Sequence, residues 1–240
     1  MSNLIVVTGS PGSGKTTVAV KLAKELYQRE HKPVILLSPD LYVPVMPFLF
    51  PRKNQNVYSL GAVLEHTEIT PNDILKCLVV PKDKKDFGVL GYIRGENVYS
   101  YAQPTPDKIM QLVAGVQKLA HHVVVDATGR LEDLISQTCW AQASHRVQLI
   151  VPDVKSLSYY LSMKEEYQKP TGAIQVVNRM EGEIPAAEPE ILEFFKEVRV
   201  TLPYSRTVKY QSMSGLLLDQ SADKPYRAAL DTLTQAVMKG

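Results

Sequence analysis

The chain has 240 residues, of which 45% are apolar, and its formal net charge at pH 7 is +2. This length suits one large α/β domain with a substantial core, and the small charge gives no strong signal for nucleic acid or anionic lipid. The two cysteines, Cys77 and Cys139, lie outside any C-x-x-C pair, which argues against a disulfide framework or a cysteine zinc site. No apolar run approaches the roughly 20 residues of a membrane span, and no signal peptide precedes Leu4, so we expect a cytoplasmic protein.

The first elements predict a βαβ unit. The β-branched run 4–8 is typical of a buried strand, apolar residues recur at helical spacing in 16–30, and 33–38 is a second apolar run. Strand, helix and strand in immediate succession imply a parallel pair. The following stretch, 39–56, is interrupted by prolines and predicts no regular helix.

Strands and helices continue to alternate along the rest of the chain. Thr-Pro pairs at Thr70 and Thr105 are helix-start signals. The predicted strands are 87–93, 121–129, 146–151, 172–180 and 197–203, and the predicted helices are 59–66, 70–78, 105–120, 130–143, 153–168, 188–195 and 224–240. This alternation predicts one doubly wound α/β domain over 1–240, with a mostly parallel sheet and helices on both faces.

A glycine-rich stretch between the first strand and the first helix matches G-x-x-x-x-G-K-[ST] in full. Glycines let backbone N–H groups turn toward phosphate oxygens, and the following helix points its positive end at them. Lys15 would supply charge to the outer phosphates, and the Thr16 hydroxyl would bind Mg²⁺. The predicted nucleotide-binding residues of this P-loop are Gly9, Ser10, Pro11, Gly12, Ser13, Gly14, Lys15, Thr16 and Thr17.

A second Mg²⁺ anchor is predicted at Asp126, which leaves the apolar run 123–125 where ligands bind in open α/β sheets. The alternative is that Asp126 caps the helix expected from Arg130. Gly129 completes a D-x-x-G pattern and would let a backbone N–H approach a γ-phosphate.

With these motifs the chain resembles the MinD/ParA group of P-loop ATPases, which belongs to the SIMIBI class and the CobQ/MinD/ParA domain type. The resemblance also rests on Asp40 and on the segments SLGAVLEHTEITPNDIL, VVVDATG, LIVPDVKSL, VVNRM and LPYSRTVKYQSMSGLLLD. It implies a Mg²⁺-dependent ATPase switch with Lys15, Asp40 and Asp126 as catalytic residues. In it Asp40 positions the attacking water, Asn178 reads adenine, and Pro203 lines the base. Asp40 and Asn178 also have a simpler interpretation as turn residues.

Two departures from the family pattern affect the expected activity. Ser10 stands where the family usually has a second lysine that reaches the partner's phosphates, and Ser38 stands where it usually has an acid. We therefore expect ATP binding with slow hydrolysis in the absence of a partner. The sequence of this P-loop is also typical of many small-molecule kinases, which are the first alternative function. A nucleotide-binding scaffold with little turnover is the second alternative. The segment around Arg94 has only one arginine, which weakens the kinase alternative.

The apolar segment 42–56 is expected either to fold onto the sheet or to form a nucleotide-dependent contact surface for a partner or second subunit. In the second case Phe48 and Phe50 would be its anchors, and Arg52 and Lys53 its rim.

Two further features favour simple structural roles. The apolar face of the last helix is expected to pack on the core, and we therefore expect no membrane binding through it. The pair His121-His122 is interpreted as a loop feature, because no third metal ligand lies near it in the sequence.

Overall fold

The computed structural model describes residues 2–50, 59–130, 132–163, 172–181, 193–195 and 198–239. These residues form a seven-stranded sheet in the order β3-β2-β4-β1-β5-β6-β7, and every pair of neighbouring strands is parallel. The strands are β1 (Asn3–Gly9), β2 (Val34–Ser38), β3 (Phe87–Gly91), β4 (His122–Asp126), β5 (His145–Ile150), β6 (Ile174–Asn178) and β7 (Val198–Leu202). This sheet confirms the predicted doubly wound fold class.

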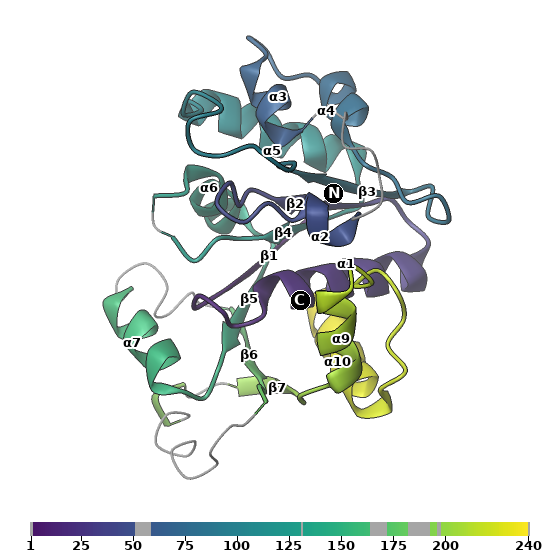
Figure 1. Cartoon of the computed structure of the whole chain (residues 1–240), viewed down its shortest axis with the longest axis vertical. Helices are drawn as coiled ribbons and strands as arrows, with labels where there is room; N and C mark the ends of the chain where they lie inside the picture. The colour runs from purple at the N-terminus through teal and green to yellow at the C-terminus, as the bar shows by residue number, and fades with distance from the viewer. Residues whose placement is uncertain are drawn as a thin grey trace.

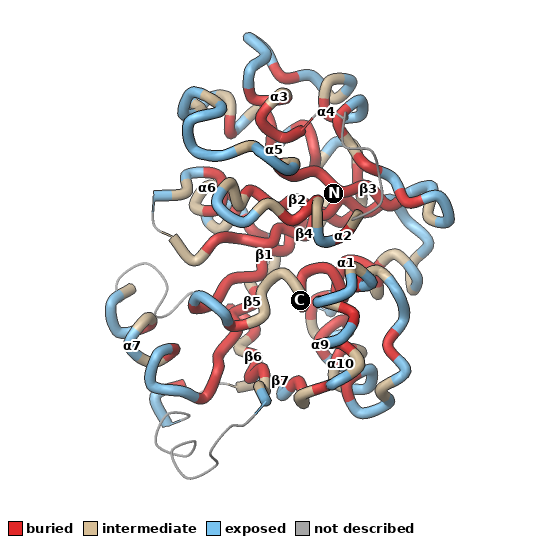
Figure 2. Tube along the Cα trace, in the orientation of Figure 1, coloured by how far each residue is buried: buried red, intermediate tan, exposed pale blue. Residues whose placement is uncertain are grey.

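Helices cover both faces of the sheet (Figure 1). One face carries α1 (Lys15–Glu30), α2 (Met46–Leu49), α9 (Arg206–Met213) and α10 (Lys224–Lys239), and the other carries α3 (Leu60–Glu65), α4 (Pro71–Cys77), α5 (Pro106–Leu119) and α6 (Leu134–Gln142). In β1, Ile5 and Val7 join the first cluster, whereas Leu4 and Val6 join the second. Successive side chains point to opposite faces of a strand, so a strand covered on both faces is apolar throughout. Figure 2 shows β1 to β4 as buried almost along their whole length, whereas the edge strand β7 is partly exposed.

The helix boundaries follow local capping signals. The Thr70 hydroxyl accepts from Asp73 N while the Asp73 carboxylate accepts from Thr70 N, which is a complete capping box. Thr105 and Asp153 each make a single N-cap bond: the Thr105 hydroxyl accepts from Lys108 N at the start of α5, and the Asp153 carboxylate accepts from Ser156 N at the start of α7 (Val154–Ser162). The Thr-Pro signals read from the sequence therefore mark real helix starts.

Helix α6 begins later than the sequence predicted. It starts at Leu134, and its N-cap is Asp133, whose carboxylate accepts from Ile135 N. Asp126 therefore does not cap this helix, and the alternative role considered for it is wrong.

Two other helices differ from the prediction. In the described part of the predicted irregular stretch, residues 39–50, there is one helical turn, α2. Pro47 is compatible with it because it lies in the first turn, where a proline is tolerated. Helix α9 was not predicted, since only Val208 and Gln211 of it are buried and its apolar periodicity is weak. Of the helix expected over 188–195, only 193–195 lie within the described residues.

The last helix is a core helix, as predicted. Tyr226, Leu230, Leu233 and Val237 are all buried against the α1 face of the sheet. None of the described helices combines the length and the apolar character that crossing a bilayer requires.

The order of the strands creates a crevice above β1. From β1 the chain builds β2, β3 and β4 on one side, and then β5, β6 and β7 on the other. Ligands of open α/β sheets bind at the carboxyl ends of strands at such a reversal point. The loops after β1, β2 and β4 meet there and carry the residues described next.

Candidate functional site

The loop 9–14 joins β1 to α1 and has the backbone geometry that its glycines predict. Gly12 and Gly14 have φ angles of 81° and 85°, a region that residues with a Cβ rarely adopt. A Cβ at Gly9 would lie 2.5 Å from Ser13 Oγ, closer than a real Cβ approaches. The loop ends at the N-terminus of a 16-residue helix, where free N–H groups and the helix dipole favour an anion.

Lys15 turns back toward the loop that precedes it. Its Nζ donates a hydrogen bond to Ser10 O at 3.0 Å. Burial lowers the pKa of Lys15, while the charges of Asp126 and Asp40 raise it. An anionic ligand would offset the desolvation of this ammonium group, so the position suits phosphate binding.

Asp126 lies at the end of β4, beside the start of α1. Ser38 Oγ donates to its Oδ2 at 3.2 Å, and the Thr16 hydroxyl also hydrogen-bonds to this carboxylate. Burial raises the pKa of Asp126 to about 6, although both hydroxyls and Lys15 act in the opposite direction. A buried carboxylate next to a threonine hydroxyl supplies the hard oxygen ligands that Mg²⁺ prefers, so these residues fit that ion.

Asp40 and Arg130 form an ion pair between the loops that follow β2 and β4. Arg130 Nη2 lies 2.7 Å from Asp40 Oδ1. The same Oδ1 accepts from the backbone N–H groups of Tyr42 and Val43 at 2.9 and 3.0 Å. Arg130 Cζ also lies 3.5 Å from the centroid of the Tyr42 ring. The sequence patterns did not single out Arg130, although its place directly after Gly129 of the D-x-x-G pattern could have signalled it.

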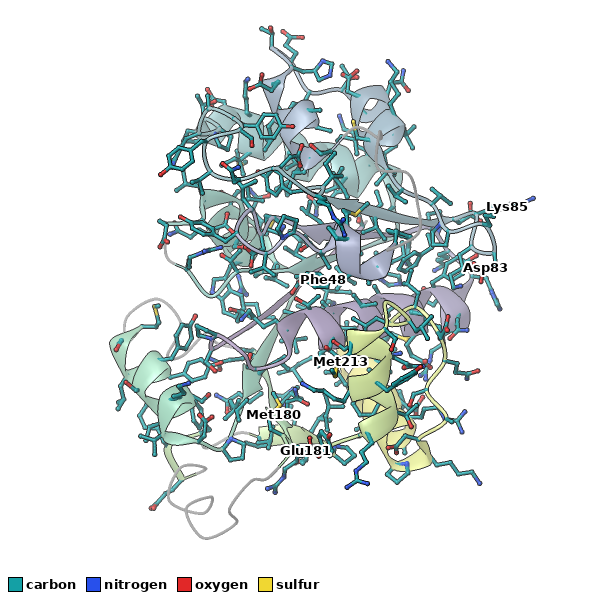
Figure 3. The ribbon with its side chains drawn as sticks, viewed as in Figure 1. Phe48, Asp83, Lys85, Met180, Glu181 and Met213 are labelled. Carbon is teal, nitrogen blue, oxygen red and sulfur yellow. The ribbon has the colours of Figure 1, made fainter. Side chains whose placement is uncertain are left out.

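Lys15, Thr16, Asp40 and Arg130 line a common cavity of about 690 Å³ at the carboxyl edge of the sheet. Lys15 and Arg130 are the cationic residues among the described residues that line it. Phe48 of α2 and Met213 of α9 lie on either side of α1 in Figure 3, and both line the cavity. The volume lies within the range of ordinary ligand pockets.

Ser10 lies in the loop 9–14, and Gly129 lies in the neighbouring loop after β4. The Ser10 side chain is buried, and its Oγ donates to Ser156 Oγ at 3.3 Å, so no side-chain cation stands at this position. A Cβ on Gly129 would lie 3.2 Å from Gly9 O and 3.6 Å from Lys15 Nζ. The two loops therefore approach each other closely enough to contact one ligand from both sides.

Asn178 and Pro203 line a smaller cavity of about 150 Å³ on the other side of the loop, together with Gly12 and Thr17. Asn178 Nδ2 donates to Ser13 O at 2.8 Å. Bidentate pairing of this amide with adenine would require that bond to break. The cavity also contains residues of α9, which the sequence patterns missed, and Tyr204.

The structure thus gathers most of the predicted site residues around two adjoining cavities. Pro11, Gly12, Gly14, Lys15, Thr16, Thr17, Asp40 and Gly129 line the larger one, whereas Asn178 and Pro203 line the smaller one. Gly9, Ser10, Ser13 and Asp126 line neither of these two cavities, and the Ser10 side chain points to Ser156.

The described part of the segment 42–56, residues 42–50, contains both buried and exposed side chains. Val45, Met46 and Leu49 are buried in the core, and Phe50 is partly buried against it. Phe48 is 47% exposed, so of the two expected anchors only Phe48 faces outward. Arg52 and Lys53 lie outside the described residues.

One family model matches the N-terminal part of the chain, which includes the loop 9–14. A family model described as chromatin associated protein KTI12 matches residues 1–55. No curated protein sequence matches the chain.

Solved structures share the fold over the full length. The cell division ATPase MinD of Pyrococcus furiosus is 18% identical, with a TM-score of 0.76 and coverage of 100% of this chain and 99% of that one. A ParA family ATPase from Chlorobium tepidum is 13% identical, with a TM-score of 0.72 and coverage of 98% and 99%. MinD of Pyrococcus horikoshii, complexed with Mg-ADP, is 16% identical, with a TM-score of 0.69 and coverage of 100% and 97%. The chain has the MinD/ParA fold.

Proposed function

We propose that this protein is a Mg²⁺-dependent ATP-binding switch that hydrolyses ATP slowly when no partner is present. The phosphate loop and Lys15 would bind the outer phosphates, and Thr16 and Asp126 would hold the metal ion. When bound, Mg²⁺ would neutralise charge on the β- and γ-phosphates. Ser38 hydrogen-bonds to Asp126 and would orient its carboxylate toward the ion. The MinD/ParA fold of the chain supports this proposal, because one solved structure with this fold, MinD of Pyrococcus horikoshii, is complexed with Mg-ADP.

The nucleotide base would lie in the smaller cavity. Asn178 and Pro203 line it beside Thr17 at the start of α1. We propose adenine as the base, because a side-chain amide can pair with its N6/N7 edge and is a poorer match for guanine.

The ion pair between Asp40 and Arg130 carries the switch proposal. It joins the loop after β2 to the loop after β4 at the wall of the larger cavity of about 690 Å³, which is called the phosphate cavity from here on. A γ-phosphate bound there would compete with Asp40 for the Arg130 guanidinium, because both are anions. Arg130 would then supply the cation that Ser10 does not, and Asp40 would become available to orient the attacking water. Loss of the ion pair would also release Tyr42 and the segment that follows it.

The test is ATP turnover by the full chain with Mg²⁺ and no added acceptor. We expect wild-type turnover below about 1 s⁻¹, the low end of ordinary enzyme rates. An Asp40→Asn variant keeps a side-chain oxygen that can accept from the Tyr42 and Val43 N–H groups, but it loses the negative charge. Its ATP turnover should fall by roughly a hundredfold. Asp223→Asn is the matched control, because Asp223 Oδ1 also accepts a backbone N–H, from Tyr226, and Asp223 itself lines neither cavity. Equal turnover in the Asp40→Asn and Asp223→Asn variants would refute the role of Asp40.

The exposed residues next to the ion pair are proposed as the nucleotide-dependent contact surface, defined here as Tyr42, Val43, Phe48 and Met213. They are 60%, 57%, 47% and 78% exposed. Three of them, all except Tyr42, line the phosphate cavity, and Tyr42 stacks on Arg130. A partner protein or a second copy of the chain placed on this surface would sense the occupied cavity.

Hydrogen exchange over residues 42–50 should therefore differ between the ATP-bound and ADP-bound protein. Replacing Arg130 by glutamine should remove the difference, because the segment is then no longer tied to the phosphate cavity.

A Phe48→Ser variant should lose ATP-dependent association while it keeps ATP binding, and Tyr99→Ser, at a 94% exposed position elsewhere, is its control. Identical exchange in both nucleotide states, or unchanged association of Phe48→Ser, would exclude this surface.

A small-molecule kinase is the second candidate function. A third cavity, of about 130 Å³, favours it because it adjoins the phosphate cavity. Tyr42, Tyr92, Tyr101 and Arg130 line this cavity, which shares Thr128 and Arg130 with the phosphate cavity. A phosphate acceptor bound there would lie next to the γ-phosphate. Turnover that requires an added metabolite would favour the kinase, whereas turnover without one favours the switch.

A further inference from the structure

Three potential metal ligands meet at the end of the molecule opposite to the phosphate cavity. His122 opens β4, whereas Asp126 closes it at the other edge of the sheet. His121 precedes His122, and the backbone N–H groups of both donate to Pro33 O, which fixes them beside the C-terminal end of α1. Glu30, the last residue of α1, supplies the third ligand that the sequence did not reveal.

The distances among these groups match a tetrahedral metal site. Glu30 Oε2 lies 3.2 Å from His122 Nε2 and 3.5 Å from His121 Nε2. Two ligands about 2.0–2.1 Å from one zinc ion at the tetrahedral angle lie about 3.3 Å apart. All three candidate ligand atoms lie within 4.8 Å of one another, and a rotation of the partly exposed His121 ring would bring them closer.

The His122 ring is an independent sign of a ligand. His122 is 1% exposed, and its buried Nε2 makes no hydrogen bond of good geometry within the described residues, although it lies 3.2 Å from Glu30 Oε2, another of the three potential ligands. The Asn3 side-chain amide lies 3.4 Å from Nδ1 and holds the other side of the ring. The second nitrogen of a metal-binding histidine donates to an acceptor, so the Asn3 amide would have to turn its oxygen toward Nδ1 when Nε2 binds a metal ion.

A cation already lies among the ligand atoms. Lys32 Nζ is 3.2 Å from Glu30 Oε2 and 3.2 Å from His121 Nε2. An ammonium group has no lone pair, so Lys32 must donate this hydrogen bond and His121 Nε2 must accept it. The lone pair of His121 Nε2 therefore points at the cation. The negative end of the α1 dipole adds to the attraction. The Lys32 side chain is 49% exposed, so a metal ion can displace it into solvent.

We propose that Glu30 Oε2, His121 Nε2 and His122 Nε2 bind a divalent zinc-type ion, with water in the fourth position. Two imidazoles and one carboxylate are ligands that suit Zn²⁺, whereas Mg²⁺ prefers oxygen alone. The bound ion would tie the end of the phosphate-loop helix to β4. This inference stands apart from the proposed function, since none of its residues lines the nucleotide cavities.

The test is the binding of Co²⁺ and of Zn²⁺, each alone, to the full chain freed of metal by chelation and kept in excess Mg²⁺. Calorimetry should give one equivalent of Zn²⁺ per chain, and Co²⁺ should show the visible absorption of a four-coordinate site. Glu30→Gln and His121→Ala should each weaken binding by more than about tenfold, because lost outer contacts alone commonly have that effect. Lys32→Ala should tighten it several-fold, since it removes the competing ammonium.

His66→Ala is the matched control, because His66 is exposed and far from the cluster in sequence. It should leave both affinity and spectrum unchanged. Zn²⁺ should also raise the melting temperature of the wild type and of Lys32→Ala, but not of His121→Ala. Absence of stoichiometric binding to the wild type, or equal affinity in the His121→Ala and His66→Ala variants, would overturn the site.

Discussion

Replacing Lys15 by alanine should weaken Mg-ATP binding by ten- to a hundredfold, with little loss of stability in the nucleotide-free protein. A charge-assisted phosphate contact contributes about 1.5–3 kcal/mol. Burial lowers the pKa of Lys15, so the ammonium is not favoured by the fold when no nucleotide is present. Calorimetric titration with Mg-ATP gives the affinity, and thermal unfolding of the same samples gives the stability.

The control for this variant is Lys118→Ala, which removes an exposed lysine of α5. It should bind Mg-ATP as the wild type does. If Lys15→Ala and Lys118→Ala bind with the same affinity, the loop does not hold phosphate in the proposed way. If Lys15→Ala unfolds far below the wild type, the hydrogen bond to Ser10 O has a structural role instead.

Replacing Asp126 by asparagine should abolish Mg²⁺-dependent ATP binding and, at the same time, stabilise the nucleotide-free protein at pH 7.5. Burial raises the pKa of Asp126 from its usual 3.8 to about 6, so the folded state binds this proton more tightly than the unfolded state. The free energy of unfolding therefore falls as pH rises from about 3.8 through about 6. Asparagine has no charge to bury, which gives a stabilisation of at most about 3 kcal/mol at neutral pH.

Denaturant unfolding at pH 4 and pH 7.5 measures this effect. The difference between wild type and Asp126→Asn should be large at pH 7.5 and nearly absent at pH 4, where Asp126 is mostly protonated in the folded state. Asp86→Asn, at an exposed position before β3, is the control and should show neither effect. A variant that is less stable than the wild type at pH 7.5 and still binds Mg-ATP would refute both the burial argument and the metal-binding role.

The local elements of this protein could be predicted because their signals lie within a few residues of each other. The phosphate loop, the strand before it and the helix after it are encoded between Asn3 and Glu30. The caps at Thr70 and Thr105 are equally local. Helix α9 escaped prediction because it buries few side chains, although its cap, Ser205, was a visible signal.

The sequence by itself determined the phosphate loop, the alternation of strands and helices, and the positions of Asp40 and Asp126 at strand ends. Only the tertiary structure decided which partners they meet. β4 enters the sheet between β1 and β2, which places Ser38 against Asp126 and Arg130 against Asp40. Hydrophobic periodicity specifies that a strand is buried but not its neighbours, because any parallel order buries the same apolar residues. Contacts between polar groups from distant strands therefore appear only once the order of the sheet is known.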